Sequence, residues 1–208
     1  MMGLLFPKKC ILCRRVLRRT EIDLCAACRQ DVEPASGKRK YQFLDSMTAV
    51  WYYEESVRRS IVRYKFYGAR YLARNFGRQL AMRVLQEDLE YDLITWVPVS
   101  RWRKFRRGYD QVELLARYTG RELGRRPLRC LKKTRNNRKQ STLRDAAQRR
   151  ANVLGVYRVT DPEQVAGKKI LLLDDVLTTG ATAGECARML LTAGAKEVHC
   201  AVLAASRK

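Results

Sequence analysis

The stretch Ile170-Leu-Leu-Leu-Asp-Asp-Val-Leu-Thr-Thr-Gly-Ala-Thr182 decides how this 208-residue sequence folds. Four consecutive apolar residues open it, and such a run is typical of a strand that a parallel sheet buries on both faces. Asp174 and Asp175 follow at the expected end of the strand, the edge where ligands bind to sheets of this kind. A short loop then opens a helix, and it consists of Thr178, Thr179, Gly180, Ala181 and Thr182.

This loop has the composition of a phosphate-binding site. Glycine lets the backbone approach a ligand closely, threonine hydroxyls add donors, and N–H groups at a helix N-terminus attract anions. The two carboxylates suit ribose hydroxyls or a hydrated Mg²⁺. The stretch therefore predicts a site for a ribose that carries a 5′-phosphate, with the phosphate in the loop and the sugar on the acids. In the alternative interpretation, the acids only cap the strand end through ordinary hydrogen bonds.

The segments around this stretch predict a parallel sheet with helices on both faces. Residues 48–53, 93–99 and 198–203 have the apolar and β-branched content of strands. Apolar residues recur at helical spacing within residues 72–84, 112–123 and 182–193. Strands and helices that alternate in this way are typical of an α/β fold. Residues 125–150 are polar and basic with weak periodicity, and residues 29–45 have the composition of a linker.

Four of the seven cysteines form the pattern C-x2-C-x11-C-x2-C, with Cys10, Cys13, Cys25 and Cys28. Each pair turns two thiolates toward one point, so two pairs make a tetrahedral site suited to Zn²⁺. With four protein ligands the zinc is expected to be structural and to supply most of the folding energy of this small module. Two disulfides are the alternative. We expect a zinc module at residues 1–35 and a main domain at residues 45–208, with chelation of zinc unfolding the module alone.

Charge is concentrated in one part of the chain. The formal net charge is +22, and residues 101–150 alone hold 18 Lys and Arg against 4 acids. This clustering favours a polyanionic partner, either nucleic acid or a phosphate-rich small molecule, over a solvated basic face. Trp102, Tyr109 and Tyr118 lie near the cations and either stack on bases or serve packing. The sequence lacks an apolar run of about 18 residues and a signal peptide, so we expect a cytoplasmic protein without membrane insertion.

At the level of motifs, residues 170–182 resemble the phosphoribosyl-pyrophosphate (PRPP) motif of type I phosphoribosyltransferases. The remaining marks are similar to the ComF family of competence-associated proteins, in which a zinc ribbon precedes a phosphoribosyltransferase domain. These marks are the four cysteines, Val97-Pro-Val99 leading to Arg107-Gly-Tyr-Asp-Gln111, and the spacing of Gln140, Leu143, Arg149 and Asn152. Asp110 departs from the family, which usually has Asn there, and the change replaces an amide donor by a carboxylate.

The resemblance implies a type I phosphoribosyltransferase-like sheet and a set of site residues. Val99, Ser100 and Arg101 would bind the diphosphate of PRPP together with Mg²⁺. The following segment would form a mobile loop whose cations contact diphosphate or nucleic acid, with Arg103, Lys104, Arg106 and Arg107. Lys65 either reaches the site or snorkels to solvent. Purine-salvage relatives carry an acid where this chain has Thr178, so the loop offers no general base.

Two functions follow from this resemblance. In the first, the protein binds PRPP and single-stranded DNA and acts in DNA uptake beside a helicase-like competence partner. In the second, it is an active phosphoribosyltransferase that transfers phosphoribose from PRPP to an unidentified acceptor. Consumption of Mg²⁺–PRPP with release of diphosphate would discriminate between them.

Overall fold

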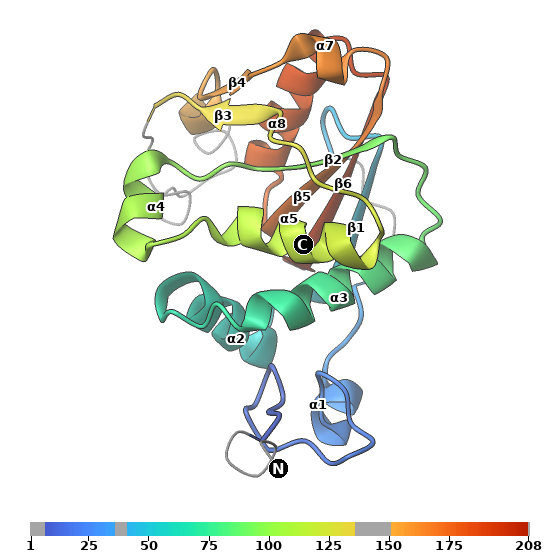
Figure 1. Ribbon diagram of the computed structural model, residues 1–208, viewed down its shortest axis with the longest axis vertical. Helices are drawn as coiled ribbons and strands as arrows, with labels where there is room; N and C mark the ends of the chain where they lie inside the picture. The colour runs from blue at the N-terminus through green and yellow to red at the C-terminus, as the bar shows by residue number, and fades with distance from the viewer. Residues whose placement is uncertain (1–6, 36–40, 136–150, 208) are drawn as a thin grey trace.

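A four-stranded parallel sheet lies at the centre of the computed structural model, which describes residues 7–35, 41–135 and 151–207. The strand order is β1 (Ser46–Tyr52), β6 (Glu197–Ala205), β5 (Lys169–Leu177) and β2 (Leu93–Trp96). The two central strands are the most buried, and the side chains of residues 170–173 are fully buried. The predicted α/β class and the predicted parallel sheet are therefore confirmed (Figure 1). Of the family marks, Gln140, Leu143 and Arg149 lie outside the described residues.

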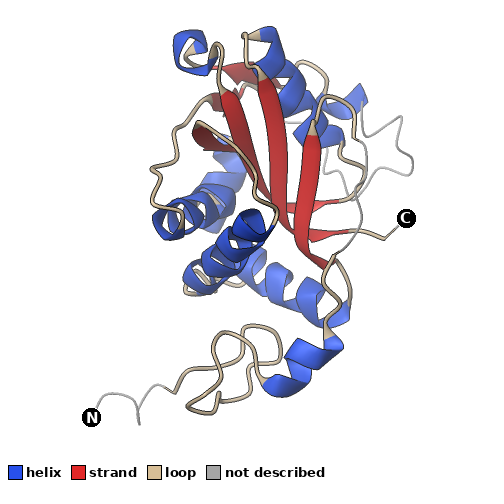
Figure 2. Ribbon diagram, turned by 90° about the vertical axis from the view of Figure 1, so that its right-hand side faces the viewer, coloured by secondary structure: helices blue, strands red, loops and turns tan. Residues whose placement is uncertain are grey.

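Helices cover both faces of this sheet (Figure 2). On one face, a buried cluster joins the strands to α2 (Glu55–Phe66), α3 (Leu72–Gln86) and α5 (Gln111–Glu122). On the other face, α8 (Ala181–Thr192) packs with the small antiparallel sheet of β3 (Leu131–Lys133) and β4 (Tyr157–Val159) and with the short α7 (Pro162–Val165). Within the described residues, no helix is long and apolar enough to span a membrane.

The structure changes three of the predicted boundaries. The strand expected to end at Leu173 continues to Leu177, because residues 174–177 keep pairing with β6. The expected loop over Arg103, Lys104, Arg106 and Arg107 is instead the helix α4 (Arg101–Arg107), which Ser100 begins and Gly108 ends in the left-handed conformation. Residues 33–35 of the expected linker bond to the outer edge of β1, since Ala35 N–H donates to Val50 C=O.

The zinc module, which includes α1 (Ala26–Asp31), packs directly on the main domain. Ile11, Leu12 and Leu24 belong to the same buried cluster as the side chains of α2 and α3. Arg63 of α2 donates to the carbonyl oxygens of Ile11 and Leu12 at 3.0 and 2.7 Å. Because these contacts join the module to both helices, we now expect loss of zinc to weaken the main domain as well. The domain boundary between residues 35 and 45 stays a prediction.

Candidate functional site

The two adjacent acids lie within β5, at a point where the strand has lost one neighbour. β2 ends at Trp96 opposite Leu173, so from Asp174 onward β5 pairs only with β6. The side toward β2 is open for ligands, although the acids are not at the strand end as predicted. Since side chains alternate along a strand, Asp175 shares a face with Leu173 and α5, and Asp174 shares the opposite face with Leu172 and α8.

Asp175 is 4% exposed and is matched by two donors from separate helices. Lys65 Nζ, in the last turn of α2, lies 2.7 Å from Asp175 Oδ1. Gln111 Nε2, in the first turn of α5, donates to Asp175 Oδ2 at 3.1 Å. Of the two interpretations of Lys65, the structure therefore supports the one in which it reaches the site. Nothing in the local pattern of the sequence pointed to this pairing, because the partners are 110 and 64 positions away.

Asp174 is in a less favourable electrostatic position. Burial and the neighbouring charge of Asp175 raise the pKa of Asp174 well above its ordinary value, and Lys65 only partly opposes them. On its own face lies Lys133 of β3, whose pKa falls to about 8 because burial and then the charge of Arg103 destabilise the ammonium form. Lys133 Nζ donates to the Tyr157 hydroxyl at 3.4 Å. Lys133 was not predicted, since it lies in a polar, basic stretch with weak periodicity.

The loop after β5 has the backbone geometry of an anion site. Gly180 has a φ of +76° and begins α8 without a side-chain cap among the described residues. A Cβ atom at Gly180 would lie 2.4 Å from the Tyr41 ring, so this position requires glycine for space as well as for φ. Thr178, Thr179, Ala181 and Thr182 are partly exposed around it. Ala181 N–H donates to Thr179 Oγ1 at 3.5 Å, and the N–H groups of Thr182 and Ala183 in the first turn of α8 remain as donors for an anion.

The turn between β2 and α4 is held by internal hydrogen bonds. Asp110 is 4% exposed and caps α5, accepting from the N–H groups of Val112 and Glu113 at 3.0 Å each. It also accepts from Val99 N–H at 3.4 Å, so this N–H points to Asp110 rather than outward. Ser100 is buried and caps α4. Of the three residues expected at the diphosphate, only Arg101 is exposed.

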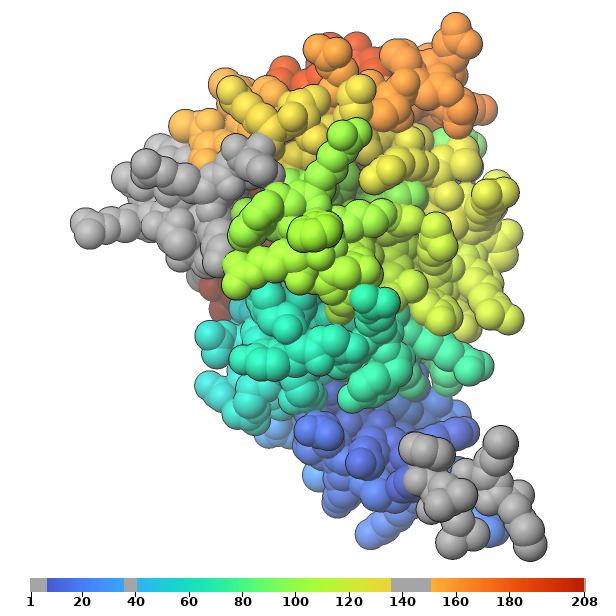
Figure 3. All heavy atoms as spheres, turned by 60° about the vertical axis from the view of Figure 1, so that its left-hand side comes forward, coloured from blue at the N-terminus to red at the C-terminus, as the bar shows by residue number. Residues whose placement is uncertain are grey.

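An exposed aromatic surface lies beside this turn, where the end of α2 meets α4. Arg107 lies over the Phe66 ring at 4.6 Å and Arg106 over the Trp102 ring at 5.4 Å. In Figure 3 the green α4 and the teal residues after α2 adjoin on one face. The surface consists of five large side chains, each between 52% and 88% exposed: Phe66, Tyr67, Tyr71, Trp102 and Phe105.

Two of the aromatic residues predicted near the cations serve packing instead. Tyr109 is 9% exposed and donates its hydroxyl to the Tyr64 carbonyl. Tyr118 packs on Gly77 of α3, and a Cβ atom at Gly77 would lie 2.6 Å from the Tyr118 Cβ. Of the three, only Trp102 is exposed to a partner.

The four cysteines converge as a metal site requires. Their Sγ atoms all lie within 4.8 Å of one another, and those of Cys13 and Cys25 are 3.6 Å apart. Zinc bonds of about 2.3 Å in a tetrahedron give sulfur separations of about 3.8 Å, so the set fits Zn²⁺. Burial opposes ionisation of Cys25, but hydrogen bonds from Cys28 N–H and the neighbouring thiols outweigh it and lower the pKa of Cys25 to about 7. Burial raises the pKa of Cys13 and Cys28, so the cluster needs a cation to ionise fully.

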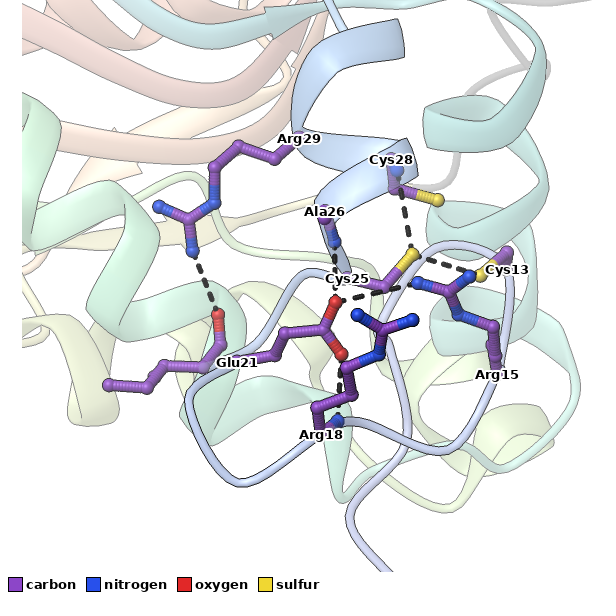
Figure 4. Close-up of polar contacts among 9 residues, drawn as sticks. Cys13, Arg15, Arg18, Glu21, Cys25, Ala26, Cys28 and Arg29 are labelled. Carbon is purple, nitrogen blue, oxygen red and sulfur yellow. Dashed lines mark hydrogen bonds and ion pairs between the residues drawn. The ribbon is translucent and has the colours of Figure 1, made fainter.

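Glu21 fixes the loop between the two cysteine pairs, as Figure 4 shows. Its carboxylate accepts from Arg18 N–H and Ala26 N–H at 2.7 Å each, and Arg15 lies 3.4 Å away. These bonds lower the pKa of Glu21 and hold the loop in register for the second pair of ligands.

Comparison with known proteins gives two family matches. The phosphoribosyl transferase domain family matches residues 114–208, and the double zinc ribbon domain family matches residues 1–39. "Competence protein F" of Haemophilus influenzae is 26% identical over 93% of this chain and 95% of that protein. "Competence protein ComFC" of Streptococcus pneumoniae is 33% identical over 74% of this chain and 65% of that protein. "DNA utilization protein YhgH" of Escherichia coli is 35% identical over 52% of this chain and 47% of that protein.

Among solved structures, the chain is similar to two chains that it matches over less than a third of their length. An allosteric regulatory enzyme of purine biosynthesis has a TM-score of 0.47 at 22% identity, and the match covers 68% of this chain and 29% of that one. The glutamine PRPP amidotransferase from B. subtilis, complexed with ADP and GMP, has a TM-score of 0.46 at 22% identity, with 68% and 30% covered.

Proposed function

The chain belongs to the ComF family, which joins an N-terminal zinc ribbon to a phosphoribosyltransferase domain, and on this premise we propose that it binds PRPP and single-stranded DNA in DNA uptake. One observation carries the PRPP site: a buried carboxylate, Asp175, lies on the open side of β5 three residues before the threonine and glycine loop that opens α8. Burying a carboxylate costs folding free energy, and such a group is commonly retained where it binds a ligand.

In this site, each group of the protein has a separate task. The N–H groups and hydroxyls of residues 178–182 bind the 5′-phosphate, and Asp175 accepts hydrogen bonds from the ribose hydroxyls. Lys65 forms an ion pair with Asp175, and Gln111 fixes the orientation of the carboxylate. Arg101 and Arg103 face the diphosphate. Mg²⁺ would neutralise the charge of the diphosphate, and Asp174 and Asp175 are the carboxylates that would hold the ion or its water ligands.

The DNA-binding role is supported by the exposed aromatic surface and its cations. Stacking of bases on aromatic rings, with arginine nearby, is how proteins bind single strands without sequence preference. Trp102 and Phe105 lie on the same short helix as Arg103, Lys104, Arg106 and Arg107. The competence and DNA-utilization names of the relatives agree with this role. We propose that the protein acts in the cytoplasm, where a competence helicase would pass single strands to it.

Calorimetric titration of the zinc-loaded protein with Mg²⁺–PRPP tests the first half of the proposal. Wild type and Glu163→Gln, which changes an exposed acid of α7, are expected to bind alike. Asp175→Asn is expected to lose at least tenfold in affinity, because the neutral amide accepts ribose hydroxyls poorly and no longer holds Lys65. Equal affinity of all three proteins would contradict the site.

Anisotropy of a labelled oligo-dT tests the second half. Replacing Trp102 and Phe105 by Ala removes two stacking faces, each worth about 1–3 kcal/mol per base, so affinity is expected to fall at least tenfold. The matched control replaces Met82 and Leu85 of α3, which are 49% and 65% exposed, by Ala. An equal effect of both double variants would mean that exposed apolar area in general, and not this surface, governs the binding.

Transfer of phosphoribose is the second candidate function, and Lys133 favours it. An amine whose pKa is about 8 is partly neutral near physiological pH and can accept a proton. In the reaction, an acceptor nitrogen would form a bond to ribose C1, the bond from C1 to diphosphate would break, and the acceptor proton would pass to Lys133 Nζ. Release of diphosphate from Mg²⁺–PRPP with candidate bases and amines, lost in Lys133→Met, is the expected result. Absence of release with every acceptor would leave binding as the function of the site.

A further inference from the structure

A cavity of about 690 Å³ lies outside the PRPP site, between the second half of α5 and the loop that follows it. Trp96, at the end of β2, lines it. We call it the arginine groove, because its other charged lining is dominated by Arg117, Arg121, Arg125, Arg126 and Arg129.

The backbone of this groove is fixed by close contacts. A Cβ atom at Gly120 would lie 2.3 Å from the Arg125 carbonyl oxygen and 2.6 Å from Pro127, so glycine lets the loop lie directly on α5. Arg125 N–H donates to Gly120 C=O at 2.8 Å, and Leu128 N–H donates to Ile94 C=O at 2.8 Å. The main chain is therefore held between α5 and β2, while the arginine side chains project outward and are exposed.

Within the described residues, little of the charge of the groove is neutralised by acidic side chains. Its one acid, Glu113, is already 2.9 Å from Arg117 and 3.2 Å from Lys104. The other four arginines form no ion pair within the described part of the chain. Like charges gathered around one cavity repel one another, and a bound polyanion reduces that repulsion.

Trp96 adds a second, independent feature. Its side chain is 6% exposed, and its indole N–H has no hydrogen-bond partner among the described residues. Because the indole nitrogen is itself buried, Trp96 contributes aromatic lining to the groove rather than a donor for a ligand. The donors of the groove are its guanidinium groups, four of which have no ion-pair partner within the described residues, and these groups suit phosphate oxygens.

We propose that the arginine groove binds the phosphate backbone of single-stranded nucleic acid and continues the path that begins on α4. Glu113 contacts Lys104 of α4 on one side and Arg117 of the groove on the other, so the two basic regions are contiguous. Figure 3 shows α4 and the yellow-green surface of α5 on the same face. α5 spans about 18 Å, which is long enough for successive phosphates rather than one. This inference rests on the DNA-binding half of the proposed function.

The test compares two triple variants that lose the same charge. Arg121, Arg125 and Arg126 are replaced by Gln in the groove variant, and Arg158, Lys168 and Lys196, all exposed, are replaced by Gln in the control. Oligo-dT affinity is measured at several salt concentrations. Since each phosphate contact contributes about 0.7 to the slope of log K against log salt for single strands, the groove variant is expected to lose about 2 from the slope. It is also expected to bind at least tenfold more weakly at low salt.

Mg²⁺–PRPP affinity and thermal stability, measured on the same proteins, are expected to stay at wild-type values, which shows that the groove variant is folded. Lys at the three groove positions is expected to keep most of the slope. A groove variant with the wild-type slope overturns this inference and leaves the proposed DNA binding intact. An equal loss in the control also overturns it, because net charge would then explain the effect. A wild-type protein that does not bind oligo-dT overturns the proposed DNA binding together with the groove.

Discussion

Two carboxylates of this protein are almost equally buried but differ in the donors and charges that surround them. Asp23 of the zinc module is 3% exposed and Asp175 of β5 is 4% exposed. Asp23 accepts from Asn75 Nδ2 at 2.5 Å and Gln79 Nε2 at 3.0 Å, and Arg78 Nε lies 3.8 Å away. These three donors all come from α3. Asp175 has two donors from two helices, and a second carboxylate, Asp174, precedes it on an open strand.

The comparison distinguishes a carboxylate that joins two parts of the fold, Asp23, from one that belongs to a ligand site, Asp175. Donors from one helix satisfy both oxygens of Asp23, so its role is complete within the protein: it holds the zinc module on α3. Next to Asp175, the protein raises the pKa of Asp174 by burial and by like charge, and the strand edge stays open. A fold keeps such an arrangement when a ligand uses it, since packing alone would favour apolar residues there.

Removal of zinc is expected to produce the largest loss of stability, and to do so where the zinc module packs on α2 and α3. Without the metal, Ile11, Leu12 and Leu24 leave the core that they share with α2 and α3, and each loses about 1.5–3 kcal/mol of burial. We expect chelation to lower the melting temperature of the main domain by at least about 10 °C. Calorimetry with and without a chelator, with zinc release followed by a colorimetric indicator, measures this. A main-domain transition that stays in place after zinc is released would mean that the module is independent.

Replacement of Lys133 is expected to change the unfolding free energy by an intermediate amount, and the change depends on pH. Its pKa is about 8 in the fold against 10.5 unfolded, so below pH 8 both states are protonated and the fold bears the full cost of the buried charge. Between pH 8 and 10.5 the folded state loses this proton first, and wild type gains stability. Lys133→Met is therefore expected to be more stable than wild type by up to about 3 kcal/mol at pH 7, with the difference vanishing near pH 10.5. Urea denaturation at several pH values measures it, and a constant difference would contradict the account.

Asp110 should give the smallest effect, although it is buried like the other two acids. Asn at this position keeps an oxygen for the N–H groups of Val112 and Glu113 and is an equally good N-cap. Burial raises the pKa of Asp110, so the loss of its charge costs little. We expect Asp110→Asn to change the unfolding free energy by less than about 1 kcal/mol, whereas Asp110→Ala, the control that removes the cap, costs about 1 kcal/mol or more. Equal losses of unfolding free energy in Asp110→Asn and Asp110→Ala would mean that the charge of Asp110, and not its cap, stabilises the fold.

The parts of the fold that the sequence predicted are those with local patterns. Apolar residues 170–173 and the periodicity of residues 112–123 predicted β5 and α5, and four cysteines with short spacing predicted the zinc module. The family and the α/β class were also predicted. α4 was missed because five of its seven residues are cationic and Trp102 and Phe105 alone are too few to establish a helical period.

The features that were missed depend on contacts between distant segments. The packing of α2, β3 and β5 sets the position of Lys133 beside Asp174 and the exposure of Phe66 and Tyr67. It also brings Lys65 to Asp175, where the sequence had left two interpretations of Lys65 open. The opposite orientation of Asp174 and Asp175 depends on how far β5 extends, which the turn-like composition of residues 174–180 hides. Gly120 gave no signal either, since its role is the close approach of the loop at Arg125.

The most direct test measures stability and PRPP affinity together on Asp23→Asn and Asp175→Asn. Urea denaturation gives the first quantity and calorimetric titration with Mg²⁺–PRPP gives the second. Asp23→Asn is expected to lose about 3 kcal/mol of unfolding free energy and to bind PRPP within about twofold of wild type, because it breaks a satisfied buried pair far from the site. Asp175→Asn leaves Lys65 without its partner but removes the like charge beside Asp174, so it is expected to lose less unfolding free energy than Asp23→Asn while losing at least tenfold in PRPP affinity. An Asp175→Asn protein that is destabilised like Asp23→Asn yet binds PRPP normally would contradict the account.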